Sequence, residues 1–225
     1  MNCPWSSWRP SDLHFCEAAV CGWVKQPANA YSNVAFLIVA ALIWTWWHRT
    51  NRQMAKELVQ ILVILFVGSF FLHASMTFIG EVADFLGMFF YVARLLLWNA
   101  ERFNRRPVRH AEAWYWFLTT IPVVLMFFGF RGVPLFETGI ALVLGFEALI
   151  YLTGDRKASY RYLAAIGGIM AVAYKIWWLD VDELWCQPHN HVMSGHVIWH
   201  CLTAFTFLLT AKFYEGYRKD RRNLT

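Results

Sequence analysis

The stretch GSFFLHASM, residues 68–76, places two polar side chains, Ser69 and His73, inside a long apolar segment. Residues four apart lie one turn apart on a helix, so the serine and the histidine share a face. A later stretch, GHVIWHCL at residues 195–202, repeats the spacing with His196 and His200. Ionisable side chains are costly inside a membrane and commonly mark function there. Both stretches therefore predict membrane-spanning helices that carry functional residues.

The composition is that of a membrane protein. The chain of 225 residues is 58% hydrophobic and 18% aromatic, with a mean hydropathy of +0.38, which is too apolar for an ordinary soluble domain. A helix needs about 20 mostly apolar residues to span a bilayer. Seven runs approach this length, at residues 30–48, 57–79, 82–100, 112–130, 134–153, 159–179 and 194–214. We therefore predict an all-α fold, an integral membrane seven-helix bundle that forms a single domain over residues 1–225.

The distribution of basic residues predicts the orientation of this bundle. Most of them lie in the connections after the first, third and fifth runs and in the tail: Arg49, Arg52, Lys56, Arg102, Arg105, Arg106, Arg109, Arg156, Lys157, Arg161, Lys212, Arg218, Lys219, Arg221 and Arg222. Because Lys and Arg accumulate in cytoplasmic loops, the N-terminus is expected outside and the C-terminus in the cytoplasm. The net charge of +5 then reflects topology and attraction to anionic lipid, and no basic patch interleaved with aromatics predicts a nucleic-acid partner.

The first 29 residues differ from the rest of the chain. They lack the charged start and apolar core of a cleavable signal peptide, and as a polar, turn-rich segment they are expected to pack over the outer mouth of the bundle. Four of the five cysteines fall on this outer side: Cys3, Cys16, Cys21 and Cys186. In an oxidising compartment they can pair in three ways, or they stay as buried thiols. We favour a bridge from Cys16 to Cys186, which would tie the segment to the loop before the seventh run.

Five polar residues are expected at the same depth in the membrane. The second run leads outward, so His73 lies about two turns from its outer end, with Ser69 one turn deeper. The third run begins outside and has Asp84 in its first turn. The seventh run also begins outside and has His196 and His200 in its first two turns. Since the apolar composition does not require this coincidence, we predict a site near the outer, non-cytoplasmic side.

These side chains are the set that zinc hydrolysis needs. Catalytic zinc is commonly held by three protein ligands and keeps a fourth position for water. His196 and His200 offer two ligands from one helix face, and His73 offers the third. Zinc lowers the pKa of its bound water toward about 7 and so creates a nucleophile. Asp84 is suited to take up and deliver the proton, and Ser69 is suited to donate a hydrogen bond to the developing oxyanion.

Each residue also has a structural explanation, and two rival functions remain. A single intramembrane histidine usually bonds a neighbouring helix, Ser69 can bond the carbonyl four residues earlier, and Asp84 suits a first helical turn. A haem protein is one rival, because histidines on facing helices can be axial ligands. The i,i+4 pair disfavours it, since two ligands from one helix face cannot lie on opposite faces of a haem. A non-catalytic lipid receptor with a structural zinc is the second rival.

The same residues carry a family resemblance. The pattern S69-x3-H73, then D84, then H196-x3-H200, together with N29-A-Y-S-N33 and G195-H-V-I-W-H-C-L-T203, resembles the alkaline ceramidase family, part of a superfamily of seven-span membrane hydrolases that includes the adiponectin-receptor-like proteins. The resemblance implies a zinc site formed by His73, His196 and His200, with Ser69 and Asp84 as the catalytic pair. The implied reaction is hydrolysis of a lipid amide such as ceramide to a long-chain base and a fatty acid. We expect the substrate to enter laterally from the bilayer.

One part of the family pattern is weak in this chain. Eukaryotic ceramidases hold calcium near the N-terminus through several acidic and amide side chains, and Glu17 matches that pattern. His14, Ala19 and Gln26 stand where other oxygen ligands would be expected. Calcium prefers six to eight oxygens, so the sequence disfavours a tight calcium site. Glu17 is expected instead to bond the N-terminal segment or Lys25.

Two further charges lie inside predicted spans. Arg94 and Glu147 are each about 12 or 13 residues from the outer start of their runs, which places both near 18–20 Å of depth. An unpaired charge at that depth is costly. We therefore predict that Arg94 pairs with Glu147, directly or through water.

Overall fold

The structure, a computed structural model, describes residues 3–154 and 158–222. It is a bundle of helices: α1 (Pro27–Ser32), α2 (Val34–Trp47), α3 (Arg52–Ser75), α4 (Phe78–Asn104), α5 (Ala111–Phe127), α6 (Gly132–Leu152), α7 (Tyr160–Val181) and α8 (Gly195–Arg222). α1 and α2 continue one another as one rod from Pro27 to Trp47, so the bundle has a helical element for each of the seven predicted runs. Of the basic residues used for orientation, Arg156 and Lys157 lie outside the described residues, as do the side chains of Arg218, Lys219, Arg221 and Arg222.

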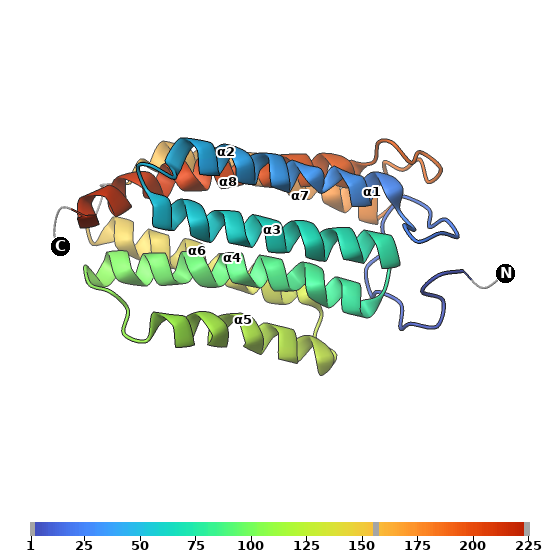
Figure 1. Cartoon of the computed structure of the whole chain (residues 1–225), viewed down its shortest axis with the longest axis horizontal. Coiled ribbons are helices and arrows are strands. Elements are labelled where there is room, and N and C mark those ends of the chain that lie inside the picture. Colours follow the sequence, from blue (N-terminus) through green and yellow to red (C-terminus); the bar gives the residue numbers. More distant parts are fainter. Residues whose placement is uncertain (1–2, 155–157, 223–225) are drawn as a thin grey trace.

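The helices lie side by side in an elongated bundle, with the N-terminal segment and the last turns of α8 at opposite ends of it (Figure 1). α3 packs against α2 and α4, α4 also packs against α5 and α6, and α8 packs against α2 and α7. α6 and α7 are consecutive in the chain, yet they make at most marginal backbone contact with each other. The side of the bundle between α6 and α7 is therefore loosely packed.

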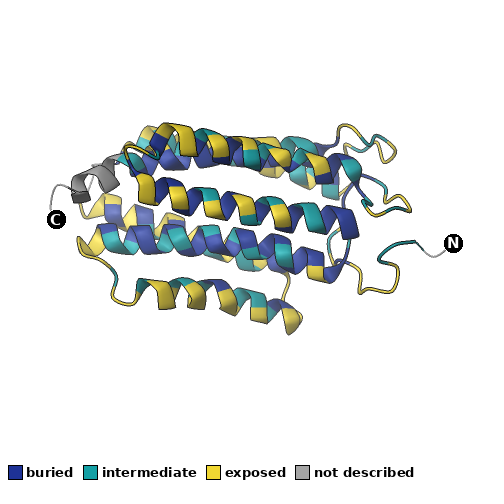
Figure 2. Ribbon diagram, viewed as in Figure 1, coloured by how far each residue is buried: buried dark blue, intermediate teal, exposed yellow. Residues whose placement is uncertain are grey.

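The surface of the bundle is suited to lipid. Five helical rods are long and apolar enough to cross a membrane: Pro27–Trp47, Arg52–Ser75, Gly132–Leu152, Tyr160–Val181 and Gly195–Glu215. α5 is apolar but shorter, with 17 residues. Large apolar side chains such as Val67, Leu142 and Val172 are more than half exposed, and exposed residues run along the outer faces of the helices (Figure 2). The prediction of an all-helical membrane bundle is confirmed.

The turn between α3 and α4 brings two predicted site residues together. Met76 adopts a left-handed conformation with φ 50°, and the Thr77 side chain caps α4 by accepting a hydrogen bond from the Gly80 amide. Further along the hairpin, a Cβ on Gly68 would lie 2.2 Å from the Ala83 carbonyl oxygen. Only glycine permits backbones to approach this closely. The next residues along each helix, Ser69 and Asp84, are neighbours as a result.

The predicted pairing of Arg94 with Glu147 is wrong. The buried Glu147 carboxylate instead accepts two hydrogen bonds from Arg102 Nη1, both of 3.0 Å. Arg94 Nη1 lies 3.5 Å from Glu57 Oε1. Arg94 and Glu147 therefore each have a partner of opposite charge, as the cost of unpaired charge requires, but the partners differ from those expected.

The register of α4 and α6 explains this difference. The expectation places the outer ends of the two helices at the same level. In the structure Gly132, the first residue of α6, packs against Phe85, seven residues after the start of α4 at Phe78. α4 therefore extends about two turns beyond α6 at this end. The offset sets Glu147 beside Arg102, two turns further along α4 than Arg94.

The N-terminal segment is pinned across the α3–α4 turn. The Ser11 amide donates to the Met76 carbonyl at 3.1 Å, and the buried Glu81 carboxylate accepts hydrogen bonds from the Ser11 hydroxyl and the Asp12 amide. Disulfides join Cys3 to Cys21 and Cys16 to Cys186. The favoured bridge is confirmed, and Cys201 is a free, exposed thiol.

Candidate metal centre

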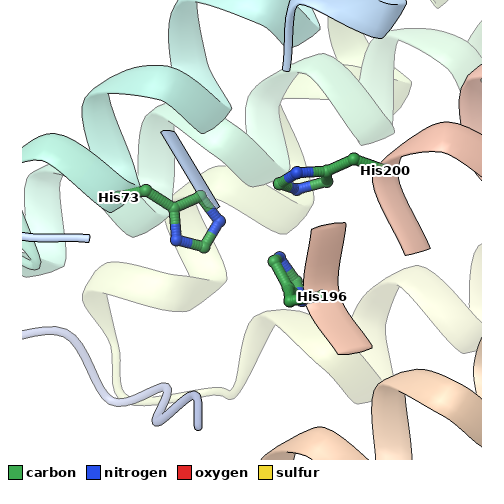
Figure 3. A group of neighbouring side chains, drawn as sticks. All are labelled: His73, His196 and His200. Atoms are coloured by element: carbon green, nitrogen blue, oxygen red, sulfur yellow. The ribbon is translucent and has the colours of Figure 1, made fainter. Parts of the chain in front are cut away.

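Three buried imidazoles meet between α3 and α8. His73 projects from α3, and His196 and His200 project from successive turns of α8 toward it (Figure 3). None is more than 4% exposed. Their candidate ligand nitrogens all lie within 4.8 Å of one another, and among the described residues this is the sole group of three or more His, Cys, Asp or Glu side chains arranged to hold a metal.

A glutamine determines which ring nitrogen of His73 carries the proton. His73 Nδ1 lies 2.9 Å from Gln26 Oε1, and Gln26 Nε2 donates to the Glu17 carbonyl at 2.7 Å. Because the amide nitrogen is engaged by Glu17, the oxygen faces the histidine and Nδ1 must carry the proton. His73 Nε2 then keeps its lone pair, and it is buried without a hydrogen-bond partner.

A serine determines in the same way which ring nitrogen of His200 carries the proton. Ser32 Oγ lies 2.7 Å from His200 Nδ1 and 2.8 Å from the Asn29 carbonyl oxygen. A hydroxyl has one proton, which Ser32 must give to the carbonyl, so His200 Nδ1–H is the donor to Ser32. The lone pair of His200 is thereby left on Nε2, 3.4 Å from Ser69 Oγ. Partners of this kind orient metal-binding histidines and raise their basicity.

His196 is positioned through its backbone and by an aromatic cover. Its amide donates to Asp180 Oδ1 at the end of α7, and Asp180 Oδ2 accepts from the Cys16 amide, each at 3.1 Å. The ring of Phe15, from the N-terminal segment, lies 4.3 Å from the His196 ring and 4.8 Å from the His73 ring, measured between centroids. His196 Nδ1 is buried without a hydrogen-bond partner.

This arrangement fits a divalent metal ion. A buried polar nitrogen without a partner costs free energy, and here such nitrogens are gathered from His73 and His196 beside the lone pair of His200. One cation would satisfy all three rings. Neutral imidazole nitrogens are good ligands for zinc, and three of them leave a fourth position open. The residues present therefore fit zinc.

Ser69 and Asp84 lie beside this histidine cluster. Both are buried, on α3 and the first turns of α4, and they neighbour one another. Together with His196 and His200 they line one end of a cavity of about 750 Å³. The structure thus brings together all five residues that the sequence singles out.

The cavity extends from the histidine cluster along α8. Its walls come mainly from α4, α6, α7 and α8, and they are mostly apolar, with Leu95, Phe136 and Met170 among them. Toward the far end of the bundle it reaches Glu147 and Tyr214. A long, mostly apolar cavity that begins at a polar site suits an amphipathic ligand with a hydrocarbon chain.

Sequence reasoning missed three positioning residues: Gln26, Ser32 and Asp180. Gln26 draws attention only as a departure from a calcium pattern, and Asp180 resembles one more acidic residue of a solvated loop. Ser32 lies within the quoted stretch N29-A-Y-S-N33 without being singled out. None of the three has a spacing that identifies its partner, because the contacts join segments more than 40 residues apart or pass through the backbone.

Comparison with known proteins identifies the family of the chain. A search among curated proteins finds no match. A family model described as Ceramidase matches residues 9–223, which is nearly the whole chain and includes the three histidines, Ser69 and Asp84. The chain therefore belongs to the ceramidase family.

Proposed function

We propose that the protein is a zinc-dependent intramembrane hydrolase that cleaves the amide bond of ceramide or a related N-acyl lipid. Family membership supports ceramide hydrolysis in general terms. The observation that carries the finer proposal is the convergence of His73, His196 and His200 beside Ser69 and Asp84 at one end of an apolar cavity. Water adds across the amide, so that the acyl group leaves as a fatty acid and the nitrogen as the amine of a long-chain base.

Each residue has a distinct task in this reaction. His73, His196 and His200 would hold the zinc, which when bound acts as a Lewis acid and activates water near neutral pH. Asp84 accepts the proton lost by the attacking water and returns it to the leaving amine nitrogen. Ser69, which neighbours Asp84, donates a hydrogen bond to the carbonyl oxygen as negative charge develops on it.

The loosely packed side of the bundle supports access from the bilayer. Between α6 and α7, hydrogen bonds join Tyr174 to Glu137 near one end and Tyr160 to Glu147 near the other. Between these pairs both helices contribute apolar cavity walls with at most marginal backbone contact. A lipid chain that enters here stays in an apolar environment throughout. We infer that the substrate arrives laterally.

The proposal includes seven membrane spans, with the histidine cluster toward the non-cytoplasmic side. α4 carries more charge than the five apolar rods, but Asp84, Arg94 and Arg102 are turned into the bundle, as charges in a span are expected to be. The disulfides lie at the same end as the histidine cluster, since the Cys16 amide bonds the Asp180 that holds His196. Disulfides persist in oxidising compartments, which supports the orientation given by the basic loops.

A substrate screen with purified full-length protein tests the proposal. Incubation with N-acyl sphingoid bases and with other acyl amides should release fatty acid and amine in equal amounts, and His200→Ala should lose both bound zinc and hydrolysis. Cys201→Ser, at an exposed position on the next residue of α8, is the matched control. Bound zinc with no hydrolysis of any acyl amide would support a structural zinc in a receptor, and a Soret band without zinc would support a haem protein.

A further inference from the structure

The buried carboxylate of Glu17 is held entirely by protein donors. The residue is 1% exposed. Oε1 accepts hydrogen bonds from the Ala28 amide and from His191 Nδ1, both at 2.9 Å, and Oε2 accepts from the Asn29 amide at 2.8 Å. Several N–H donors satisfy a buried carboxylate well. The expectation that Glu17 bonds the N-terminal part of the chain is confirmed, with His191 as an additional partner from the loop before α8.

These residues do not fit calcium, which the family resemblance implies at this place. Calcium takes six to eight oxygen ligands, and the nearby oxygens are engaged elsewhere. The Glu17 carbonyl accepts from Gln26 Nε2, Gln26 Oε1 accepts from His73, and Asn29 Oδ1 accepts from the Ser194 hydroxyl at 2.7 Å. Positions 14 and 19 hold histidine and alanine. In the described part of the chain, Glu17 belongs to no group of three or more acidic, His or Cys side chains that would hold a metal.

The hydrogen bonds of Glu17 connect three segments around the histidine cluster. Glu17 belongs to the N-terminal segment, Ala28 and Asn29 belong to α1, and His191 belongs to the α7–α8 loop. The Ala18 amide also donates to the Pro188 carbonyl at 2.8 Å, and the Cys16–Cys186 disulfide joins the same two segments. We call Glu17, Ala28, Asn29 and His191 the Glu17 brace.

The Glu17 brace is connected to two of the clustered histidines through residues at the two ends of α1. Gln26, one residue before α1, and Ser32, at its last position, are the residues that set the ring protons of His73 and His200. Because the brace fixes the start of α1, it fixes the places of both. We propose that the Glu17 brace takes the structural place of a calcium ion. It positions Gln26 and Ser32, and through them His73 and His200, without calcium.

The first test is a metal analysis of full-length protein purified in detergent. After passage over a calcium-depleting resin, the protein is equilibrated with 1 mM radioactive calcium, a concentration on the order of the weakest extracellular calcium modules. We expect no stoichiometric calcium and no rise in the unfolding temperature. Stoichiometric calcium that raises the unfolding temperature, and that is lost in Glu17→Gln, would overturn the proposal.

The second test measures zinc affinity by competition with a chromogenic chelator. Glu17→Gln and Gln26→Met should each weaken zinc binding about 10- to 100-fold, as substitution of partners of metal ligands does. His191→Gln, at a partly exposed position, should weaken it less while the fold persists. His189→Gln, in the same loop and exposed, is the matched control and should bind zinc as the wild type does.

The second half of this proposal, the positioning of the histidines, rests on the zinc site of the proposed function. The two tests distinguish a failure of the brace from a failure of the proposed function. Wild-type affinity in both Glu17→Gln and His191→Gln would overturn the brace while leaving the hydrolase intact. Should Glu17→Gln fail to fold, His191→Gln decides the matter alone. A wild-type protein that binds no zinc would contradict the proposed function, whereas the calcium measurement would still decide the first half.

Discussion

At the residue scale the proposed reaction has one geometric requirement: the Ser69 hydroxyl and the Asp84 carboxyl must both reach the reacting carbonyl without displacing the histidines. The two groups lie on different helices: Ser69 lies on α3 one turn from His73, and Asp84 lies opposite on α4. The histidines are meanwhile held from behind by Gln26 and Ser32. In the proposed reaction, metal binding and proton transfer therefore involve separate side chains.

Because the proposed metal ligands are other side chains, we predict that Ser69 and Asp84 can be substituted without loss of zinc. Asp84→Asn removes the group that moves the proton and should lower kcat about 10²- to 10⁴-fold. Ser69→Ala removes one donor to the developing oxyanion and should lower kcat about 10²-fold or more. Metal content and steady-state hydrolysis, measured on the same samples, check both. Full activity in either variant would remove that residue from the proposed reaction.

At the scale of elements, the site depends on the close contact between α3 and α4 at Gly68. An alanine there would place its Cβ 2.2 Å from the Ala83 carbonyl oxygen, so the helices would have to separate. We expect Gly68→Ala to destabilise the protein by about 1–3 kcal/mol, as overpacking commonly does, and to lower activity because Ser69 moves away from Asp84.

Gly145→Ala is the matched control for this change. A Cβ on Gly145, in α6, would meet nothing within 4 Å. Thermal unfolding in detergent should therefore separate the two variants, with only Gly68→Ala less stable than the wild type. Equal unfolding temperatures for the two would contradict the account of the α3–α4 contact.

The buried ion pair between Arg102 of α4 and Glu147 of α6 gives a second prediction at this scale. Arg102→Leu leaves Glu147 buried with a charge that has lost its cation, which costs about 3–5 kcal/mol in comparable buried pairs. Arg102→Leu combined with Glu147→Leu removes both charges and should be more stable than the single variant. Arg94→Leu combined with Glu147→Leu offers no such rescue, because these two residues belong to different pairs. Rescue by the Arg94 combination would contradict the observed register.

At the scale of the whole molecule, the orientation in the membrane can be tested directly. Leu184 and Arg105 are exposed near opposite ends of the bundle. In sealed vesicles of known sidedness, and in a Cys201→Ser background, an impermeant maleimide should label Leu184→Cys from the non-cytoplasmic side and Arg105→Cys from the cytoplasmic side. The reverse pattern would invert the proposed topology.

Much of the fold and of the candidate site could be predicted from the sequence. Apolar runs identified the helices, because length and hydropathy decide what spans a bilayer. The i,i+4 pair of His196 and His200 and the depth of His73 identified the cluster, because helix geometry fixes both. The partner of Glu147 was not predictable, since it depends on a two-turn offset between α4 and α6 that no local pattern records. The role of Gln26 was not predictable either, because an irregular segment positions it.

The measurement that tests the central claim most directly is hydrolysis by metal-stripped protein as zinc is added back. Full-length protein in a lipid bilayer, freed of metal by a chelator that is then removed, is given a ceramide, and release of the long-chain base is followed against bound zinc. The account predicts negligible hydrolysis without zinc and a rate that rises until each chain holds one ion between His73, His196 and His200. Undiminished hydrolysis by the zinc-free protein, or none with every site filled, would contradict it.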